Sequence, residues 1–268
     1  MAIDKDKNYD IIVFPNQDEG LKAQRVLVSR GMEFKHISTL AVAVPKDSLQ
    51  EACRLIIAEH VHISGHYPFL YRDYEEDFFK KAEAYKVSDP KGEFLKTITL
   101  CYVAPCMADV KKIRLIAYLD RDISEVLPYL NAVIKGGSYN RRGSILTYVK
   151  EGVIVNLYNI KITVAKADDI IDAWVLLDEA KKLINNAYQN RDTIKPSYEE
   201  KVRVTALQIY GWLPKTNCKA CGEATCLAFA VKLLLGEQKI GHCVPLSTEQ
   251  KFSENKNIMR EMAEALGV

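Results

Sequence analysis

The sequence predicts an α+β protein in which two small domains precede a mostly helical segment with a cluster of cysteines. In the first two thirds of the chain, short apolar runs of strand character alternate with amphipathic stretches of helical period. Residues 71–96 then shift to charged and aromatic types, which indicates a connecting helix or linker between two units. Beyond these units, four of the seven cysteines lie between Cys218 and Cys243. We therefore expect domains at 1–70, 97–192 and 193–268.

The first domain, residues 1–70, is expected to be a ferredoxin-like sandwich. Its predicted elements are a strand at 9–14, a helix at 18–30, strands at 34–40 and 41–44, a helix opened by Pro45 and Asp47 that runs to Ile57, and a strand at 62–70. This β-α-β-β-α-β order is typical of an antiparallel sheet with both helices on one face.

The second domain, residues 97–192, is expected to be a separate α+β unit. A turn at Asp89-Pro90-Lys91-Gly92 marks the boundary before it. Its predicted elements are a strand at 113–119, a helix at 123–134, strands at 145–150, 153–158 and 162–165, and a long helix at 168–191. This layout resembles one half of the saddle of the TATA-binding protein over about 75 residues, and it implies no DNA-binding role.

The third unit, residues 193–268, contains the cysteine cluster between two predicted helices. The first helix covers about 198–210, and the second is a tail helix with apolar residues at helical spacing, Phe252, Met259, Met262 and Leu266. A further helix is expected from Cys226 to Gly236. We expect Pro245 to prevent further helix after Cys243.

The four cysteines have the spacing C-x2-C-x4-C-x16-C, formed by Cys218, Cys221, Cys226 and Cys243. A cubane [4Fe–4S] cluster needs four thiolates that converge from different directions, and Gly222 permits the tight bend between the second and third of them. Structural zinc usually takes two C-x2-C-like pairs, which the second half of this spacing does not supply. A redox dithiol of Cys218 and Cys221 would leave the other two cysteines unexplained. The spacing therefore favours the cluster.

The stretch from Trp212 to Pro245 resembles the small [4Fe–4S] domain of the corrinoid iron–sulfur protein large subunit and of the B subunit of the Rnf electron-transport complex. The resemblance covers about 35 residues and includes Leu-Pro-x-Thr-Asn before the first Cys, Cys-Gly-Glu-Ala-Thr-Cys, and the helix Ala-Phe-Ala-Val-Lys. It implies a [4Fe–4S] cofactor with four ligands, Cys218, Cys221, Cys226 and Cys243. The corrinoid-binding barrel of the first family and the membrane anchor and extra ferredoxin motifs of the second have no counterpart here. The whole chain is similar to iron–sulfur proteins of anaerobes whose activity is not established.

Several other residues can either belong to a functional site or have an ordinary structural role. Cys101 and Cys106 can form a second metal or redox site, or be unreactive core and loop thiols. A histidine tract can bind metal or lie on a solvated edge strand, namely His60, His62 and His66. His242 can tune the cluster or be exposed surface. Lysines around the cluster segment can dock an acidic partner or form a solvated face, namely Lys215, Lys219, Lys232 and Lys239.

Composition excludes some classes of function. The 268 residues include 37 basic and 35 acidic side chains, dispersed along the chain, so no basic block predicts nucleic-acid binding. No apolar run reaches membrane-spanning length, and residues 1–10 lack the apolar stretch of a secretory signal. An odd number of cysteines, mostly clustered, suits a metal site in a reducing compartment. We therefore expect a cytoplasmic protein.

From these features we expect an electron carrier without catalytic activity of its own. It would pass single electrons from the cluster to a redox partner protein, a metalloenzyme such as a corrinoid or nickel system of anaerobic one-carbon metabolism. Four cysteine ligands would leave no open iron for a substrate. The alternative is a metallocofactor maturation or adapter subunit in which the cluster is structural or redox-sensing.

Overall fold

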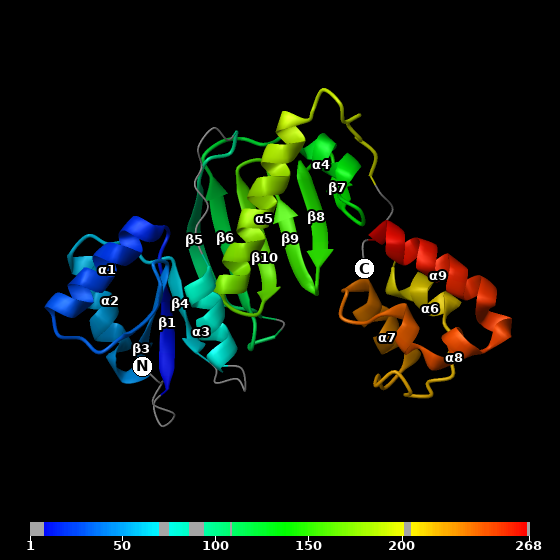
Figure 1. Ribbon diagram of the computed structural model, residues 1–268, viewed down its shortest axis with the longest axis horizontal. Helices are drawn as coiled ribbons and strands as arrows, with labels where there is room; N and C mark the ends of the chain where they lie inside the picture. The colour runs from blue at the N-terminus through cyan, green and yellow to red at the C-terminus, as the bar shows by residue number, and fades with distance from the viewer. Residues whose placement is uncertain (1–7, 70–74, 86–93, 108, 201–204, 267–268) are drawn as a thin grey trace. The chain divides into compact units, whose positions relative to one another are not determined.

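The computed structural model describes residues 8–69, 75–85, 94–107, 109–200 and 205–266 (Figure 1). By compactness the chain divides into two units. Unit 1 comprises residues 1–122 and 160–185, and unit 2 comprises residues 123–159 and 186–268.

Unit 1 consists of the N-terminal elements together with β10 and most of α5, which come later in the chain. Its elements are β1 (Tyr9–Val13), α1 (Gln17–Ser29), β2 (Lys35–Ser38), β3 (Ala41–Pro45), α2 (Leu49–Ala58), β4 (Gly65–Phe69), α3 (Glu75–Ala84), β5 (Ile98–Pro105), β6 (Ile113–Leu119), β10 (Lys161–Ala167) and α5 (Ile170–Gln189).

Unit 2 contains a strand-rich part and the C-terminal helices. Its elements are α4 (Leu127–Val133), β7 (Ser138–Asn140), β8 (Ile145–Lys150), β9 (Val153–Leu157), α6 (Ala206–Trp212), α7 (Cys226–Leu234), α8 (Val244–Thr248) and α9 (Ser253–Leu266). The described strands of unit 1 lie in the order β2-β3-β1-β4-β5-β6-β10, with both parallel and antiparallel pairs, and those of unit 2 in the order β9-β8-β7. The predicted α+β class is thus confirmed.

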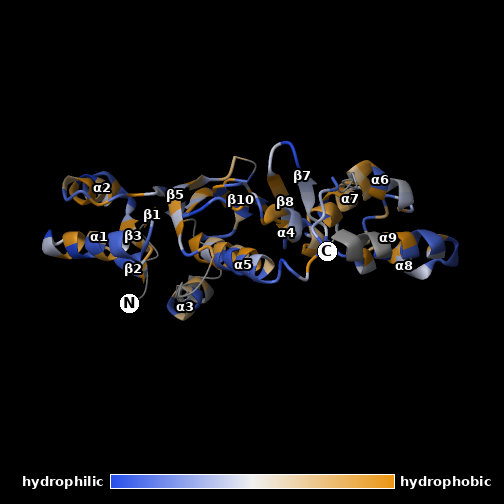
Figure 2. Cartoon of the chain, turned by 90° about the horizontal axis from the view of Figure 1, so that it is seen from above, coloured by the Kyte–Doolittle hydropathy of each residue, from blue (hydrophilic) through white to orange (hydrophobic). Residues whose placement is uncertain are grey.

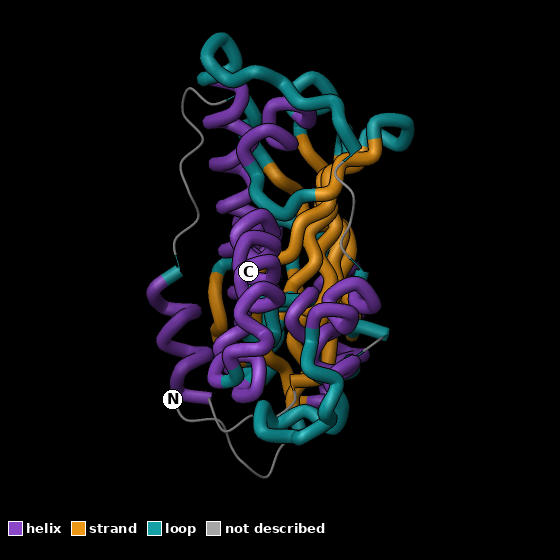
Figure 3. The backbone as a smooth tube through the Cα atoms, turned by 90° about the vertical axis from the view of Figure 1, so that its right-hand side faces the viewer, coloured by secondary structure: helices purple, strands orange, loops and turns teal. Residues whose placement is uncertain are grey.

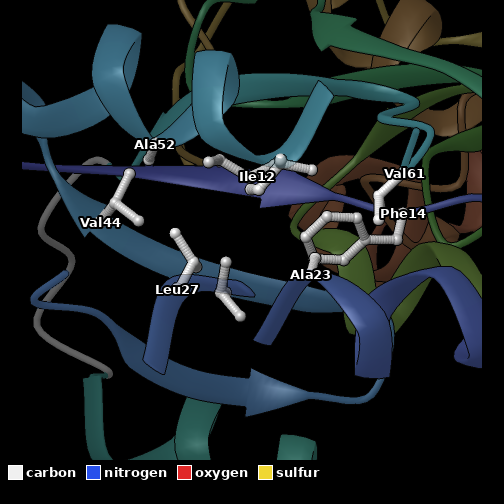
Figure 4. Packing of buried hydrophobic residues seen from close by; sticks show 9 residues of the cluster. Ile12, Phe14, Ala23, Leu27, Val44, Ala52 and Val61 are labelled. Carbon is white, nitrogen blue, oxygen red and sulfur yellow. The ribbon is translucent and has the colours of Figure 1, made fainter. Parts of the chain in front are cut away.

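The first six elements follow the predicted β-α-β-β-α-β order, and β1 pairs antiparallel with both β3 and β4. α1 begins where the side chain of Asn16 accepts a hydrogen bond from the N–H of Glu19 at 3.0 Å. Side chains from β1, α1, β3 and α2 meet in a buried cluster between the strands and the two helices (Figure 4), made of Ile12, Phe14, Ala23, Leu27, Val42, Val44, Ala52, Ile56 and Val61. Helices α1 and α2 therefore cover one face of these strands.

The opposite face of these strands is buried as well, which the sequence interpretation did not expect. Ile11 points away from the α1 and α2 side because neighbouring strand residues alternate between faces, and it is fully buried. Its partner on β4, Tyr67, accepts a hydrogen bond from the N–H of Ile170 at the start of α5, at 3.3 Å. α3 also contacts β2. The two helices α1 and α2 thus lie on one face as expected, while α5, from later in the chain, contacts the second face.

The expectation that residues 1–70 and 97–192 build separate sheets is also wrong. β4 pairs with β5 in parallel, with Gly65 opposite Val103. Gly65 has φ of 149°, and a Cβ at this position would lie 2.4 Å from the carbonyl oxygen of Val103, so a side chain there would block the pairing. Beside it, the hydroxyl of Ser64 donates to the carbonyl of Leu100 at 2.6 Å. The two predicted sheets are therefore joined edge to edge.

The connecting segment predicted at 71–96 contains α3, and it is held against α5 by polar contacts. Lys81 Nζ donates to the carboxylate of Asp172 at 2.9 Å. The Tyr85 hydroxyl donates to Asp178 at 2.8 Å. Figure 2 shows hydrophobic and hydrophilic residues along α5, as expected of a helix with one buried side. The turn predicted at 89–92 lies outside the described residues.

In unit 2, β7, β8 and β9 pair as antiparallel neighbours. Glu151 and Gly152 join β8 to β9 with φ of 50° and 82°, the left-handed pair that a two-residue hairpin turn requires. After residue 195 the described chain contains helices and loops but no strand (Figure 3). No helix within the described ranges combines the length and apolar character needed to cross a membrane.

The C-terminal helices have their own hydrophobic core, which includes Cys243 and packs against Cys221 and Cys226. α6 begins at a reciprocal cap formed by Thr205 and Gln208, later than the predicted start at 198. Pro245 does not stop helix formation as predicted. It lies in the first turn of α8, where its missing N–H would have had no helical partner.

Candidate metal centre

The segment between α6 and α7, residues 213–225, is here called the cysteine loop. Its backbone repeatedly enters the left-handed region, with φ of 61° at Lys215, 49° at Asn217, 62° at Lys219 and 84° at Gly222. Each non-glycine residue in this conformation costs about 1–2 kcal/mol. Such a costly conformation persists only where surrounding contacts hold it.

The four predicted cysteines line one hollow, which encloses about 310 Å³ including space open to solvent. Its lining residues are Leu213, Thr216, Asn217, Cys218, Lys219, Cys221, Glu223, Thr225, Cys226, Phe229, Cys243, Val244 and Pro245. The thiols differ in burial. Cys218 is exposed, Cys221 and Cys226 are half-buried, and Cys243 is buried. The hollow is thus open on the side of Cys218 and closed on the side of Cys243.

Cys226 is the first residue of α7 and is held by Asn217. The N–H of Cys226 donates to the side-chain oxygen of Asn217 at 2.8 Å, and the N–H of Asn217 donates to the sulfur of Cys226 at 3.4 Å. Thr225 caps the same helix by accepting from the N–H of Ala228 at 3.0 Å. The sequence Thr-Cys therefore places one thiol at a capped helix start.

A polar network holds the other side of the cysteine loop. Glu223 is buried, and it accepts hydrogen bonds from Lys232 at 2.9 Å and from the side-chain amide of Gln238 at 2.8 Å. The same amide lies 3.4 Å from the carbonyl oxygen of Cys221. His242 donates from Nδ1 to Gln238 Oε1 at 2.7 Å. The hydrogen bond from Lys232 and, next, that from Gln238 lower the pKa of Glu223. The bond to Glu223 in turn raises the pKa of Lys232.

The surroundings of two thiols shift their pKa values in opposite directions. The N–H of Ala220, followed by the hydroxyl of Thr216, lowers the pKa of the exposed Cys218 thiol. Burial, followed by the charges of the other three thiols, raises the pKa of Cys243. Cys218 is therefore the more readily ionised of these two cysteines.

The donor set suits an iron–sulfur cluster. All four candidate donors are thiols, the ligand type of cubane clusters, and an N–H already points at one sulfur. In the part of the chain that the structure covers, no three His, Cys, Asp or Glu side chains gather closely enough to hold a single metal ion. The four cysteines border a common hollow.

The lysines predicted around the cluster have different surroundings. Lys215 and Lys219 are exposed in the cysteine loop, and Lys239 is exposed before His242. Lys232 instead binds Glu223. The whole stretch 215–220 is exposed, as expected of a loop that brings the site to the surface.

The histidine tract does not lie on an edge strand, so that expectation is wrong. His60 adopts φ of 58° in the turn after α2, and His62 precedes β4. Only His66 belongs to β4, which lies between β1 and β5, and its ring is 3.6 Å from the carboxylate of Asp10. Cys101 is exposed on β5, while Cys106 is buried just after it.

Three residues that organise the site were not predicted: Asn217, Glu223 and Gln238. Asn217 and Glu223 stand in the resembling motif, but the motif gives no partner for either. A weak signal was present, because Asn is one of the few side chains that tolerates the left-handed conformation. Gln238 lies 15 residues beyond Glu223, and no local pattern indicates such a contact.

Comparison with known proteins locates the similarity in this same region. A family model described as "Putative Fe-S cluster" matches residues 213–245. The acetyl-CoA decarbonylase/synthase complex subunit gamma of Methanocaldococcus jannaschii is 47% identical over 60 residues, 22% of this chain and 12% of that protein. The subunit of the same name from Methanosarcina acetivorans is 52% identical over 48 residues, 18% of this chain and 10% of its own.

A third relative is the corrinoid/iron-sulfur protein large subunit of Moorella thermoacetica, 50% identical over 40 residues, 15% of this chain and 9% of that protein. The chain thus spans about a tenth of the length of the curated relatives it matches. No solved structure matches the chain. The predicted resemblance to the corrinoid protein is confirmed. Residues 213–245 are accordingly assigned to the iron–sulfur cluster family, and the cofactor of this part of the chain is an iron–sulfur cluster.

Proposed function

We propose that Cys218, Cys221, Cys226 and Cys243 ligate one [4Fe–4S] cluster, and that the protein transfers single electrons to a partner metalloenzyme. The observation that carries this proposal is the single hollow lined by all four thiols and open at an exposed loop. Four thiolates complete the coordination of a cubane, which favours electron transfer over substrate binding at iron. Cys218 is the exposed ligand, so the shortest route for an electron to a docked partner starts there.

The partner is proposed to be a corrinoid or nickel metalloenzyme of anaerobic one-carbon metabolism. The similar proteins are named as subunits of a complex or as a corrinoid protein subunit, and they come from methanogens and an acetogen. Lys215, Lys219 and Lys239 are exposed near the cluster, which suits a partner with an acidic docking face. Electron transfer to such a partner should slow as ionic strength rises, because exposed charges are screened.

We propose that the remainder of the chain serves as the body that holds the partner. Its N-terminal part has the strand order β2-β3-β1-β4, which supports a ferredoxin-like arrangement of the first four strands. The later strands and α5 support the half-saddle layout. The domain boundaries at residues 70, 96 and 192 remain part of this proposal.

One observation favours a second function. Cys243 is buried in the hydrophobic core of the C-terminal helices, so a cluster there would also stabilise the local fold. A maturation or adapter subunit with a structural or redox-sensing cluster would use the same site.

The deciding experiment is anaerobic purification of the chain, followed by iron and sulfide analysis and a redox titration. Four iron and four sulfide per chain, with rapid reversible one-electron reduction, support the electron carrier. A cluster that cannot be reduced reversibly, or that transfers intact to an apo-protein, supports the second function. Zinc without sulfide would refute both.

A further inference from the structure

We propose that Asn217 is a positioning residue that sets the reduction potential of the cluster through Cys226. This inference rests on the ligand set proposed above. It concerns the pair of hydrogen bonds that joins Asn217 to Cys226 across nine positions of sequence.

The side chain of Asn217 acts on the backbone of Cys226. The first N–H groups of a helix have no partner within the helix, and Cys226 is the first residue of α7. Asn217 Oδ1 accepts this N–H at 2.8 Å, while Thr225 satisfies a different one, that of Ala228. The cysteine loop is thereby fastened to the helix start at the ligand itself.

The backbone of Asn217 acts on the sulfur of Cys226. Its N–H lies 3.4 Å from Sγ and donates to it. Hydrogen bonds to ligand sulfurs are one determinant of cluster potential, because reduction adds negative charge that the donors stabilise. Holding this N–H in place should therefore favour the reduced cluster.

The side-chain contact and the backbone conformation together favour asparagine at this position. The residue has φ of 49°, a conformation that glycine and asparagine adopt readily and most other residues avoid. Glycine would keep the backbone conformation but lose the acceptor. Aspartate would keep the acceptor but add a negative charge. The two substitutions therefore separate the contributions of the side chain.

The test measures the midpoint potential of anaerobically prepared wild type, Asn217→Gly, Asn217→Asp and Thr205→Ala. In Asn217→Gly the side chain no longer holds the N–H against the sulfur, and the equilibrium constant for reduction should fall by up to about tenfold, which is 59 mV for one electron. Thr205→Ala is the matched control. It removes the cap of the neighbouring helix α6, and Thr205 does not line the hollow, so the potential of this variant should equal that of the wild type.

An unchanged potential in Asn217→Gly, or an equal shift in Thr205→Ala, would overturn the inference. If Asn217→Gly assembles no cluster, the iron content of Asn217→Asp decides. A full complement of iron in Asn217→Asp supports positioning by the side-chain acceptor. A loss of iron equal to that of Asn217→Gly contradicts it. The proposed function is tested separately on the wild type, because it fails if that chain holds no iron and sulfide or if its cluster is not reduced reversibly.

Discussion

Substitution of glycine by alanine is expected to have opposite effects on stability at Gly20 in unit 1 and at Gly211 in unit 2. A Cβ on Gly20 in α1 would lie 1.9 Å from the carbonyl oxygen of Thr39, so Gly20→Ala must displace the helix from the strand connection. We expect a loss of at least about 1–3 kcal/mol in the free energy of unfolding. Gly211 in α6 has nothing within 4 Å of the added carbon, and Gly211→Ala should gain about 0.5–1 kcal/mol. Urea unfolding followed by circular dichroism would check both, and equal effects would contradict the packing around Gly20.

Glu19 gives the protein an acid-sensitive contact. The N–H of His62 donates to its carboxylate at 2.7 Å and Lys22 lies 3.0 Å away, which together lower its pKa from 4.5 to about 2. The stabilisation is therefore complete above about pH 4.5 and is lost as the pH falls toward 2. In Glu19→Gln we expect the difference in urea midpoint from wild type to shrink through this window.

The control for Glu19 is Glu59→Gln, which removes an exposed ion pair with Arg30. Surface pairs of this kind contribute at most about 1 kcal/mol, so its midpoint should stay close to wild type throughout. A wild-type advantage over Glu19→Gln that persists unchanged at pH 2 would contradict the assigned contact.

At the site, the sequence was sufficient to group the four cysteines but not to describe what holds them. Spacing grouped Cys218, Cys221 and Cys226 in one short segment, and the structure brings Cys243 to the same hollow. Residues 215–220 are exposed. The hydrogen bonds of Asn217 and Glu223 depend on three-dimensional contacts that no spacing pattern encodes.

Among the elements, α3 depends on α5 for its position. The Tyr85 hydroxyl, just beyond α3, is partly buried, and its hydrogen bond to Asp178 on α5 measures 2.8 Å. Burial, followed by Asp178, raises the pKa of Tyr85. Tyr85→Phe should cost about 1–2 kcal/mol, because a half-buried acceptor loses a donor.

Hydrogen exchange should locate this loss in α3 before it reaches β1. Tyr118→Phe, on the exposed side of β6, is the control and should change stability by less than about 0.5 kcal/mol. Equal protection of α3 in Tyr85→Phe and wild type would show that the contact is dispensable.

Helices and strands were predicted where the local pattern was strong. The expected helices at 18–30 and 168–191 correspond to α1 and α5, and Pro15 and Gly31 mark boundaries that depend only on local backbone chemistry. The short strand β7 was missed, since three residues are too few to show alternation. Pro245 was misread because proline opens a helix as readily as it ends one.

For the whole molecule, the main prediction concerns Cys226→Ser. The helices that surround the cysteines share a core distinct from that of the N-terminal strands. Loss of the proposed cluster should therefore loosen residues 206–252 and leave β1 to β6 protected, because metal binding stabilises only the part that depends on it. Hydrogen exchange by mass spectrometry, with iron analysis of the same sample, would check this. Unfolding of the entire chain would instead favour a structural role for the cluster.

The continuous sheet could not be predicted for a physical reason. Residues 1–70 and 97–192 each show complete strand patterns of their own, so two closed units satisfied the sequence equally well. The joining contact is between Gly65 and Val103, which are far apart in sequence. In the sequence alone, Gly65 does not indicate the pairing of β4 with β5, because the need for glycine arises only from the close approach of Val103.

The parallel contact between β4 and β5 also determines how this protein can be divided. Each of these strands shields the other's unpaired backbone groups, which would otherwise form an open sheet edge. A fragment that ends after β4 would leave those groups free to pair with another copy. The N-terminal segment, although it has a core of its own, is therefore expected to self-associate when produced alone.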